Sequence, residues 1–466
     1  MKGFRTFTTT LFLLVLVGQS QRANASTLTP LWLFSGGADG GMPLAGLIQG
    51  GDTNFYGTAS AGGTNNWGVV FSITPSGTLT NLHRFTGGAD GGIPESAPFQ
   101  SSDGNFYGTT FSGGSNFVGV IYKLTPAGTL TTLWQFSGGA ADGGEPIGGL
   151  VQGSDSNFYG TASAGGSHSA GVVFRISSAG IFSNLYNFTG AGDGGSPGAG
   201  LVQGFDTNFY GTTSIGGTNG GNGTIFRITP AGTLTTVYRF KGGVDGGEPE
   251  AGLIQGSDTN LYGTTFIGGH GNGVVFQLSS AGTLTPLHSF AANGSDGANP
   301  VAGLIFASDG LLYGTTSGGG TNGNGTVFRV NTTGTTFTNV CIFGGGPGGG
   351  ISQGGLVQGV DSNFYGTTSS GGTGNNGNVF KLVLASSTTN TLTQITSILV
   401  VGTDVYVLLP TLNGETYQLQ FSNSMNPTNW ANVVGASQAG TGSLITLTNI
   451  GGALQPQRFY RVDISP

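Results

Sequence analysis

Carboxylates are the residues of this chain whose type and spacing could do chemistry. Six aspartates recur in glycine-rich loops of the approximate form Gly-Gly-x-Asp-Gly-Gly-x-Pro: Asp39, Asp90, Asp142, Asp193, Asp245 and Asp296. A hard cation such as Ca²⁺ takes about six to eight oxygen ligands, so these loops could hold one only by converging. A carboxylate can also accept hydrogen bonds from the amides of its own turn. The pattern favours turn structure and leaves a Ca²⁺ site as the alternative. No other cofactor is expected.

A second series of aspartates lies in a short turn directly before an aromatic tetrad. Its members are Asp52, Asp103, Asp155, Asp206, Asp258, Asp309 and Asp361. One carboxylate at an identical place in every copy indicates a role in the turn itself. Five cations share a later position: Lys123, Arg175, Arg227, Arg329 and Lys381. We expect them to pair with these turn carboxylates between neighbouring copies.

Catalysis would need acids that differ from one copy to the next. Glu248 and Glu250 lie beside one glycine-rich loop and form the candidate acid pair of a polysaccharide hydrolase or lyase. Such an enzyme requires acids with perturbed pKa values at one particular place. Most polar residues here repeat in every copy instead. The sequence therefore favours a protein without catalytic residues and keeps this pair as the alternative.

Longer loops carry amides, aromatics and histidines that vary between copies. The candidate ligand-binding residues among them are Asn66, Trp67, Asn116, Phe117, His168, Asn222, His270 and Asn324. Amides can hydrogen-bond sugar hydroxyls and an aromatic ring can stack on a sugar ring, which suits a neutral glycan. Asn and Gly also fill turns that need a positive φ, so turn formation is the alternative reading.

These residues are carried by a tandem repeat. The tetrad Phe-Tyr-Gly-Thr, or Leu-Tyr-Gly-Thr, begins at residues 55, 106, 158, 209, 261, 312 and 364, at intervals of 51 or 52 residues. Each copy contains four short apolar runs separated by turn signals, a pattern typical of four antiparallel strands. Seven such units predict an all-β, seven-bladed β-propeller.

The ends of the repeat region predict how the ring closes. Residues 28–34 match the fourth strand of a copy, and the last copy stops after its third strand at 378–382. We therefore expect the N-terminal strand to complete the seventh blade, which removes two free sheet edges. Short turns should lie on one face and the longer, variable loops on the other. Loops on a rigid scaffold are where binding usually occurs.

The repeat resembles a known family. Gly-Leu-Val-Gln-Gly-x-Asp-x-Asn-Phe-Tyr-Gly-Thr-Thr, followed by Gly-Gly and then Val-Phe-x-Ile-Thr-Pro-Ala-Gly-Thr-Leu-Thr, is similar to the Gloeo/Verruco tandem repeat of exported bacterial proteins. It also resembles propeller repeats of the NHL type. The resemblance covers roughly residues 27–385 and implies a propeller fold and export, with no catalytic residues.

The flanking segments differ in composition from the repeats. Lys2 and Arg5 precede an apolar run, and Ala23, Asn24 and Ala25 follow it, so residues 1–25 are interpreted as a secretory signal peptide. Residues 26–385 form the propeller, and 386–394 a linker. Residues 395–466 resemble the small β-sandwich of exported verrucomicrobial proteins, which implies an accessory domain.

Charge restricts the partners. The mature chain has ten Lys and Arg against twenty Asp and Glu, which argues against nucleic acid and anionic membranes. The sequence thus predicts a secreted, monomeric, non-catalytic protein without membrane insertion that binds a neutral glycan or a cell-surface or extracellular partner. A polysaccharide-active enzyme and a structural envelope or matrix component are the alternatives.

Overall fold

The computed structural model describes residues 26–217, 220–291, 293–384, 397–410, 416–422, 431–439, 443–450 and 459–465. The predicted signal peptide and the predicted linker lie outside these residues. Two compact units are present, one of them Ser26–Leu384 and the other containing the strands from Ser397 onward. Each is described by itself.

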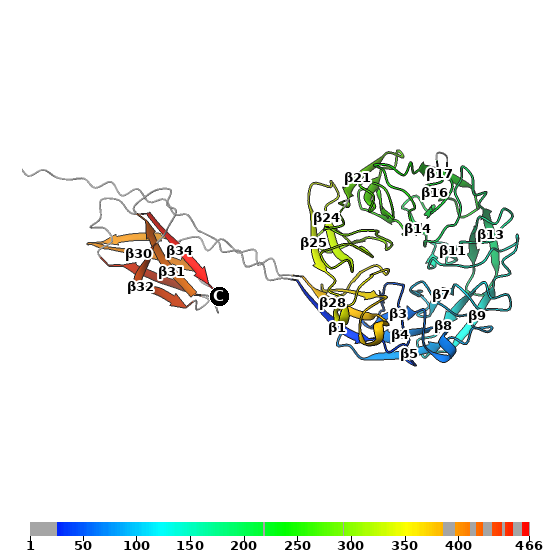
Figure 1. Ribbon diagram of the computed structural model, residues 1–466, viewed down its shortest axis with the longest axis horizontal. Helices are drawn as coiled ribbons and strands as arrows, with labels where there is room; N and C mark the ends of the chain where they lie inside the picture. Colours follow the sequence, from blue (N-terminus) through cyan, green and yellow to red (C-terminus); the bar gives the residue numbers. More distant parts are fainter. Residues whose placement is uncertain are drawn as a thin grey trace, which may run out of the picture. The chain divides into compact units, whose positions relative to one another are not determined.

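Ser26–Leu384 forms seven four-stranded antiparallel sheets arranged as the blades of a ring (Figure 1). The prediction of an all-β, seven-bladed propeller is confirmed. No α-helix occurs in the described ranges, whose only helical turns are the 3-10 segments η1 (Thr64–Asn66), η2 (Gly346–Gly348) and η3 (Thr373–Asn375). Within the same ranges, no helix is long and apolar enough to cross a membrane.

The strands follow the repeat. Blade 1 contains β2 (Ile48–Gln49), β3 (Phe55–Ala59), β4 (Val69–Ile73) and β5 (Leu79–Arg84), and blade 2 contains β6 (Phe99–Gln100), β7 (Phe106–Thr110), β8 (Val120–Leu124) and β9 (Leu130–Gln135). Blade 3 contains β10 (Val151–Gln152), β11 (Phe158–Ala162), β12 (Val172–Ile176) and β13 (Phe182–Asn187), and blade 4 contains β14 (Val202–Gln203), β15 (Phe209–Thr213), β16 (Thr224–Ile228) and β17 (Leu234–Arg239). Blade 5 contains β18 (Ile254–Gln255), β19 (Leu261–Thr265), β20 (Val274–Leu278) and β21 (Leu284–Ser289), and blade 6 contains β22 (Ile305–Phe306), β23 (Leu312–Thr315), β24 (Thr326–Val330) and β25 (Phe337–Ile342). Blade 7 contains β26 (Val357–Gln358), β27 (Phe364–Thr368), β28 (Asn378–Val383) and β1 (Thr27–Leu33).

The tetrad requires its glycine for a packing reason. A Cβ atom on Gly57 would lie 2.8 Å from Cζ of Phe71, which pairs with it on the next strand. Gly211 has the same relation to Phe226, at 2.6 Å. The phenylalanine ring of the third strand therefore occupies the space above the second strand, where only a glycine leaves room for it.

Neighbouring blades are joined by one repeated hydrogen bond. The threonine of each tetrad donates through its hydroxyl to a backbone carbonyl just before the first strand of the next blade, as Thr58 does to Ser96 at 3.0 Å. The seven bonds measure 2.6–3.3 Å, and the last of them runs from Thr367 to Ala45, between blades 7 and 1. Because both partners are buried, each bond satisfies groups that would otherwise be left without water.

Blade 7 contains strands from both ends of the propeller unit. β1 pairs antiparallel with β28, from Thr27 opposite Val383 to Leu33 opposite Asn378. Directly after β1, Phe34 is fully buried and packs edge-on against Phe71 of blade 1 at 5.4 Å between ring centroids. The N-terminal segment thus contacts the last blade and the first.

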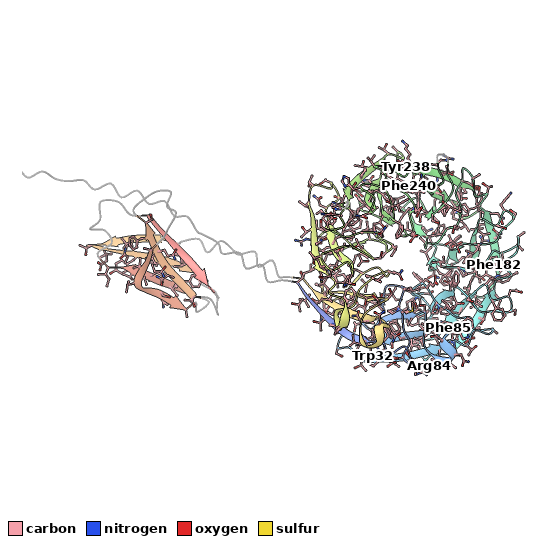
Figure 2. All side chains as sticks on the ribbon, in the orientation of Figure 1. Trp32, Arg84, Phe85, Phe182, Tyr238 and Phe240 are labelled. Atoms are coloured by element: carbon pink, nitrogen blue, oxygen red, sulfur yellow. The ribbon has the colours of Figure 1, made fainter. Side chains whose placement is uncertain are left out.

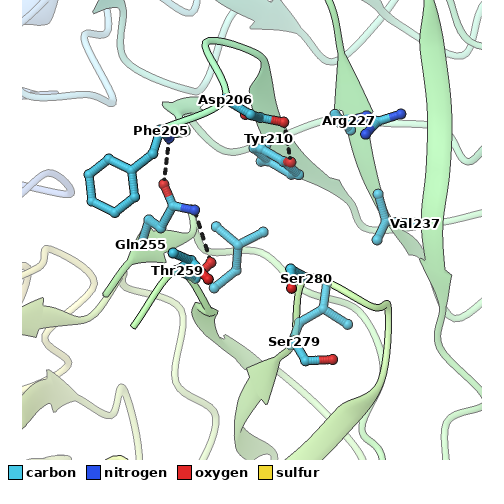
Figure 3. Close-up of a pocket in the computed structure, with 11 residues that line it drawn as sticks. Phe205, Asp206, Tyr210, Arg227, Val237, Gln255, Thr259, Ser279 and Ser280 are labelled. Atoms are coloured by element: carbon cyan, nitrogen blue, oxygen red, sulfur yellow. Dashed lines mark hydrogen bonds between the residues drawn. The ribbon is translucent and has the colours of Figure 1, made fainter. Parts of the chain in front are cut away.

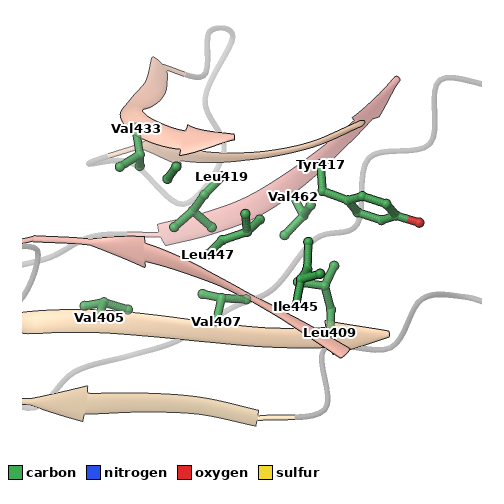
Figure 4. Packing of buried hydrophobic residues seen from close by; sticks show 10 residues of the cluster. Val405, Val407, Leu409, Tyr417, Leu419, Val433, Ile445, Leu447 and Val462 are labelled. Carbon is green, nitrogen blue, oxygen red and sulfur yellow. The ribbon is translucent and has the colours of Figure 1, made fainter. Parts of the chain in front are cut away.

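The C-terminal unit contains two three-stranded sheets. One has the order β29 (Ser397–Val401), β30 (Asp404–Pro410), β33 (Leu444–Asn449), and the other β32 (Ala431–Ala439), β31 (Thr416–Ser422), β34 (Phe459–Ser465). Both contribute to one apolar cluster, with Val407 and Leu447 from the first sheet and Leu419, Val433 and Val462 from the second (Figure 4). The unit therefore has a core of its own.

Candidate ligand-binding face

Antiparallel topology sorts the loops of every blade onto two faces. We call turn face the side formed by the short turns between the first and second and between the third and fourth strands. We call loop face the opposite side, formed by the links between blades and by the loops between the second and third strands. In the described ranges the loops between the second and third strands are 60–68, 111–119, 163–171, 214–217 with 220–223, 266–273, 316–325 and 369–377.

The six aspartates of the links between blades each cap their own loop. Asp39 accepts hydrogen bonds from Nε1 of Trp32 at 3.1 Å and from the backbone N–H of Ser35 at 3.0 Å. The other five carboxylates likewise contact a side chain of the outer strand, in the pairs Asp90–His83, Asp142–Trp134, Asp193–Tyr186, Asp245–Tyr238 and Asp296–His288. Figure 2 shows Trp32 and Tyr238 on the outer rim of the ring.

These carboxylates are not brought together into a metal site. Across the described part of the chain, no group of three or more His, Cys, Asp or Glu residues is placed to hold a metal ion. The link between blades 6 and 7 has no aspartate, and the outer-strand position before it is Cys341, whose pKa is raised by burial. The arrangement provides one hydrogen-bonding carboxylate per loop, which is what a turn requires.

The aspartates of the turn face are equally engaged. Each accepts a hydrogen bond from the tyrosine hydroxyl of its own tetrad, at 2.6–2.9 Å. Burial raises the pKa of Asp103, but hydrogen bonds from Asn105, Tyr107 and Lys123 outweigh it and lower the pKa to about 2.

The expected pairing of cations between blades is corrected by the structure. The Nζ atom of Lys123 lies 3.3 Å from Asp103, and that of Lys381 lies 3.0 Å from Asp361. Both pairs lie within one blade. The reason is strand register, since Lys123 is directly opposite Tyr107, whose hydroxyl already contacts Asp103.

Three of the predicted ligand-binding residues pack into the scaffold. Trp67, Asn222 and Asn324 occupy one equivalent position, and their backbone carbonyls accept hydrogen bonds of 2.8–2.9 Å from the following link. The Trp67 ring covers Gly87 and Gly92, where an added Cβ would come within 2.2–2.5 Å of it. Each of the three residues is partly buried.

The other five predicted residues are exposed at the tips of the loops. They are Asn66, Asn116, Phe117, His168 and His270. The first four lie on the neighbouring blades 1, 2 and 3, whereas His270 lies on blade 5. Phe117 is 65% exposed and has a φ of 59°. Asn66 accepts a hydrogen bond from Gly62 at 2.7 Å, and Asn116 donates one to the carbonyl of Phe136 at 3.2 Å. The bond to Asn66 uses its amide oxygen, and the bond from Asn116 uses its amide nitrogen.

The remaining acids of the propeller form two close pairs. Burial of its carboxyl group and the nearby charge of Glu248 raise the pKa of Glu250. The residue as a whole is exposed. Burial and the charge of Glu145 likewise raise the pKa of Glu95. From the sequence, only Glu248 and Glu250 were expected as a catalytic pair. Glu95 could have been found because it occupies the position of Glu250 in another copy, the last residue of the Gly-Gly-x-Pro-x pattern.

Fold and repeat together define a class. The chain is a seven-bladed β-propeller built from one tandem repeat. The model of the Gloeobacter/Verrucomicrobia repeat matches residues 19–221 and 203–417, and the chain belongs to this repeat family, as its sequence predicted. None of the curated proteins matches the sequence.

Solved structures of low sequence identity resemble the chain. The tricorn protease is 14% identical, with a TM-score of 0.37 over 80% of this chain and 33% of its own. Puromycin hydrolase is 11% identical, with a TM-score of 0.43 over 70% of this chain and 50% of its own. The BP39L lectin from Burkholderia pseudomallei is 13% identical, with a TM-score of 0.46 over 73% of this chain and 98% of its own. The chain thus spans one third of the first protein and half of the second.

Proposed function

We propose that this chain is an exported, non-catalytic repeat protein that binds a neutral glycan or a cell-surface partner through the loop face. The observation that carries this proposal is that the loops of three neighbouring blades, blades 1–3, expose copy-specific side chains. Phe117 offers an exposed apolar ring on blade 2, and Asn66, Asn116 and His168 expose groups that donate and accept hydrogen bonds on blades 1, 2 and 3. Export is supported by the pattern of residues 1–25.

The propeller is a suitable support for such a site. We infer that the pairing of β1 with β28 closes the ring. It supplies the fourth strand of blade 7, so that β28 is not left with a free edge. We also infer that the two sheets of the C-terminal unit pack as a β-sandwich accessory module around their shared cluster. A closed ring holds its loops in place, which reduces the ordering entropy that binding must overcome.

Phe117→Ala is expected to weaken glycan retention at least about tenfold, because burying a phenylalanine side chain contributes about 1.5–3 kcal/mol. The unfolding temperature should stay unchanged, since the ring is 65% exposed in the free protein. The measurement is retention of residues 26–466 on a panel of soluble and insoluble neutral polysaccharides, with and without Ca²⁺, together with an assay for released reducing ends.

Ile181→Ala is the matched control, because Ile181 is 71% exposed but lies on the turn face. It should bind as the unaltered protein does. Equal retention by the Phe117→Ala variant would contradict binding through Phe117 and the loops of blades 1–3. If neither retention nor release occurs with any polysaccharide, a protein partner or a structural envelope or matrix role becomes the better proposal.

The second candidate function is that of a polysaccharide hydrolase or lyase in which Glu248 and Glu250 are the catalytic acids. The raised pKa of Glu250 favours it, because a general acid must hold its proton near the working pH. Release of sugar ends that disappears in Glu250→Gln would support the enzyme. Retention that persists in the same variant without any release would support the binding protein.

Glu250→Gln should also change the pH dependence of stability. The raised pKa means that the ionised carboxylate is less favourable in the folded protein than in the unfolded chain, so stability is lost as the pH rises through this pKa. The neutral amide removes that loss. We expect the unfolding temperature to rise by about 1–2 °C at pH 7 and to stay unchanged at pH 3. A thermal melt at both pH values measures this, and a fall at pH 7 would contradict the expected sign.

A further inference from the structure

A ladder of aromatic rings joins most neighbouring blades. The tetrad tyrosine of one blade packs on the tetrad phenylalanine of the next, stacked in three pairs and tilted in two, with ring centroids 3.9–4.5 Å apart. The pairs are Tyr56–Phe106, Tyr107–Phe158, Tyr159–Phe209, Tyr313–Phe364 and Tyr365–Phe55. Five of the seven seams between blades are filled in this way.

Leucine replaces the phenylalanine at the other two seams. At the seam between blades 5 and 6 the residue is Leu312, and the missing ring is supplied by Phe306, which packs edge-on over Tyr262 at 5.4 Å. Phe306 stands where six of the seven blades have a glutamine. That seam is therefore closed by a different aromatic residue.

The seam between blades 4 and 5 has no such replacement. Leu261 takes the place of the phenylalanine, and blade 5 keeps its glutamine, Gln255. In the described ranges Tyr210 contacts no aromatic ring, and it is the only one of the seven tetrad tyrosines that is not buried. Val237 further reduces the filling, because the same position is leucine in five of the other six copies.

A cavity of about 420 Å³ occupies this seam on the turn face (Figure 3). Its volume falls within the range of about 300–1,000 Å³ typical of small-molecule sites. Leu261, Leu278 and Tyr210 give it an apolar wall. Phe205 stands at its edge and is 69% exposed, where five of the other six copies have glycine or serine.

Polar groups of both signs face the same cavity. Burial raises the pKa of Asp206, but hydrogen bonds from Asn208 and Tyr210 and the charge of Arg227 outweigh it, so the pKa is lowered and the carboxylate is ionised at neutral pH. Gln255 is held in place by the N–H of Phe205 at 2.8 Å and by the carbonyl of Thr259 at 2.9 Å (Figure 3). Asp206 and Arg227 together add no net charge to the lining.

We propose that this cavity binds one neutral sugar ring, stacked on Tyr210 in the space that a phenylalanine fills in five other seams. A pyranose has an apolar C–H face and a rim of hydroxyls that both donate and accept hydrogen bonds. The tyrosine ring and the leucines match the face, while Asp206 can accept from the rim and Arg227 and Gln255 can donate to it. The site lies on the opposite side of the propeller from the loop face, and its test does not depend on glycan binding there.

Leu261→Phe tests the proposal by restoring the missing ring. The scaffold accepts phenylalanine here in five other copies, so we expect a higher unfolding temperature together with at least tenfold weaker binding. The probes are methyl glycosides of neutral hexoses and of fucose, measured on residues 26–466 by isothermal titration calorimetry and saturation-transfer NMR. Leu312→Phe is the matched control. Because Phe306 already fills that seam, it should leave sugar binding unchanged and should not raise the unfolding temperature.

Arg227→Ser keeps the proposal testable if the larger side chain disturbs the fold. Serine occurs naturally at the equivalent Ser72, so this variant should still fold, with an unfolding temperature lower by at most about 1–2 °C, and bind the sugar at least fivefold more weakly. Arg175→Ser, at a filled seam, should bind as the unaltered protein does. Undiminished binding by Leu261→Phe would overturn the proposal, as would the absence of binding to any glycoside. If the protein binds p-cresol but none of the glycosides, the proposed class of ligand, a neutral sugar, is wrong.

Discussion

Deletion of residues 26–34 is expected to lower the unfolding temperature of the propeller by more than about 10 °C and to cause aggregation. The deletion removes the strand that pairs with β28 and the fully buried ring of Phe34. Loss of a buried phenylalanine alone costs about 3–5 kcal/mol. The exposed edge of β28 would then offer unpaired N–H and C=O groups to other chains. Calorimetry and light scattering measure the two effects.

Phe34→Ala separates the packing from the strand pairing. It should reproduce about half of the fall in unfolding temperature without the aggregation, because β1 still covers β28. Val383→Ala is the control within the same strand pair, since Val383 is 40% exposed, and it should change little. A deletion variant that melts like the full chain would show that β1 does not close the ring.

Acid is expected to unfold the propeller between about pH 4 and pH 2, as the turn aspartates take up protons. The turn aspartates with a lowered pKa are Asp52, Asp103, Asp155, Asp206, Asp258 and Asp361. A lowered pKa in the folded state contributes stability that is fully present above the unfolded value and is lost as the pH falls. One such group recurs in nearly every blade, so the losses add around the ring. A series of thermal melts from pH 7 to pH 2 tests this.

Asp103→Asn checks the origin of that acid transition. The pKa of Asp103 is lowered to about 2, so the variant should be less stable than the unaltered protein at pH 7, and the difference should disappear near pH 2. Glu250→Gln has the opposite sign, because the pKa of Glu250 is raised. A destabilisation by Asp103→Asn that is equally large at pH 2 would assign the loss to packing instead of charge.

Local sequence patterns were sufficient for the architecture. Four short strands per copy, seven tetrads and the turn residues between them predicted the seven-bladed propeller, because each feature depends on neighbours along the chain. The copy-specific loop residues were less predictable. Trp67 and Phe117 look alike as loop aromatics, yet Trp67 packs on two glycines of the next link while Phe117 stays exposed. That difference depends on a segment about twenty residues away, which periodicity does not reveal.

By itself, the sequence determined the repeat, the number of blades and the two places, Leu261 and Leu312, where the tetrad loses its phenylalanine. It did not reveal that these two substitutions have different consequences. Only the tertiary structure decided this, because whether a seam is filled depends on side chains from two blades at once. Phe306 reaches across to Tyr262 and closes one gap, while Gln255 bonds to its own turn and leaves Tyr210 open beside the other.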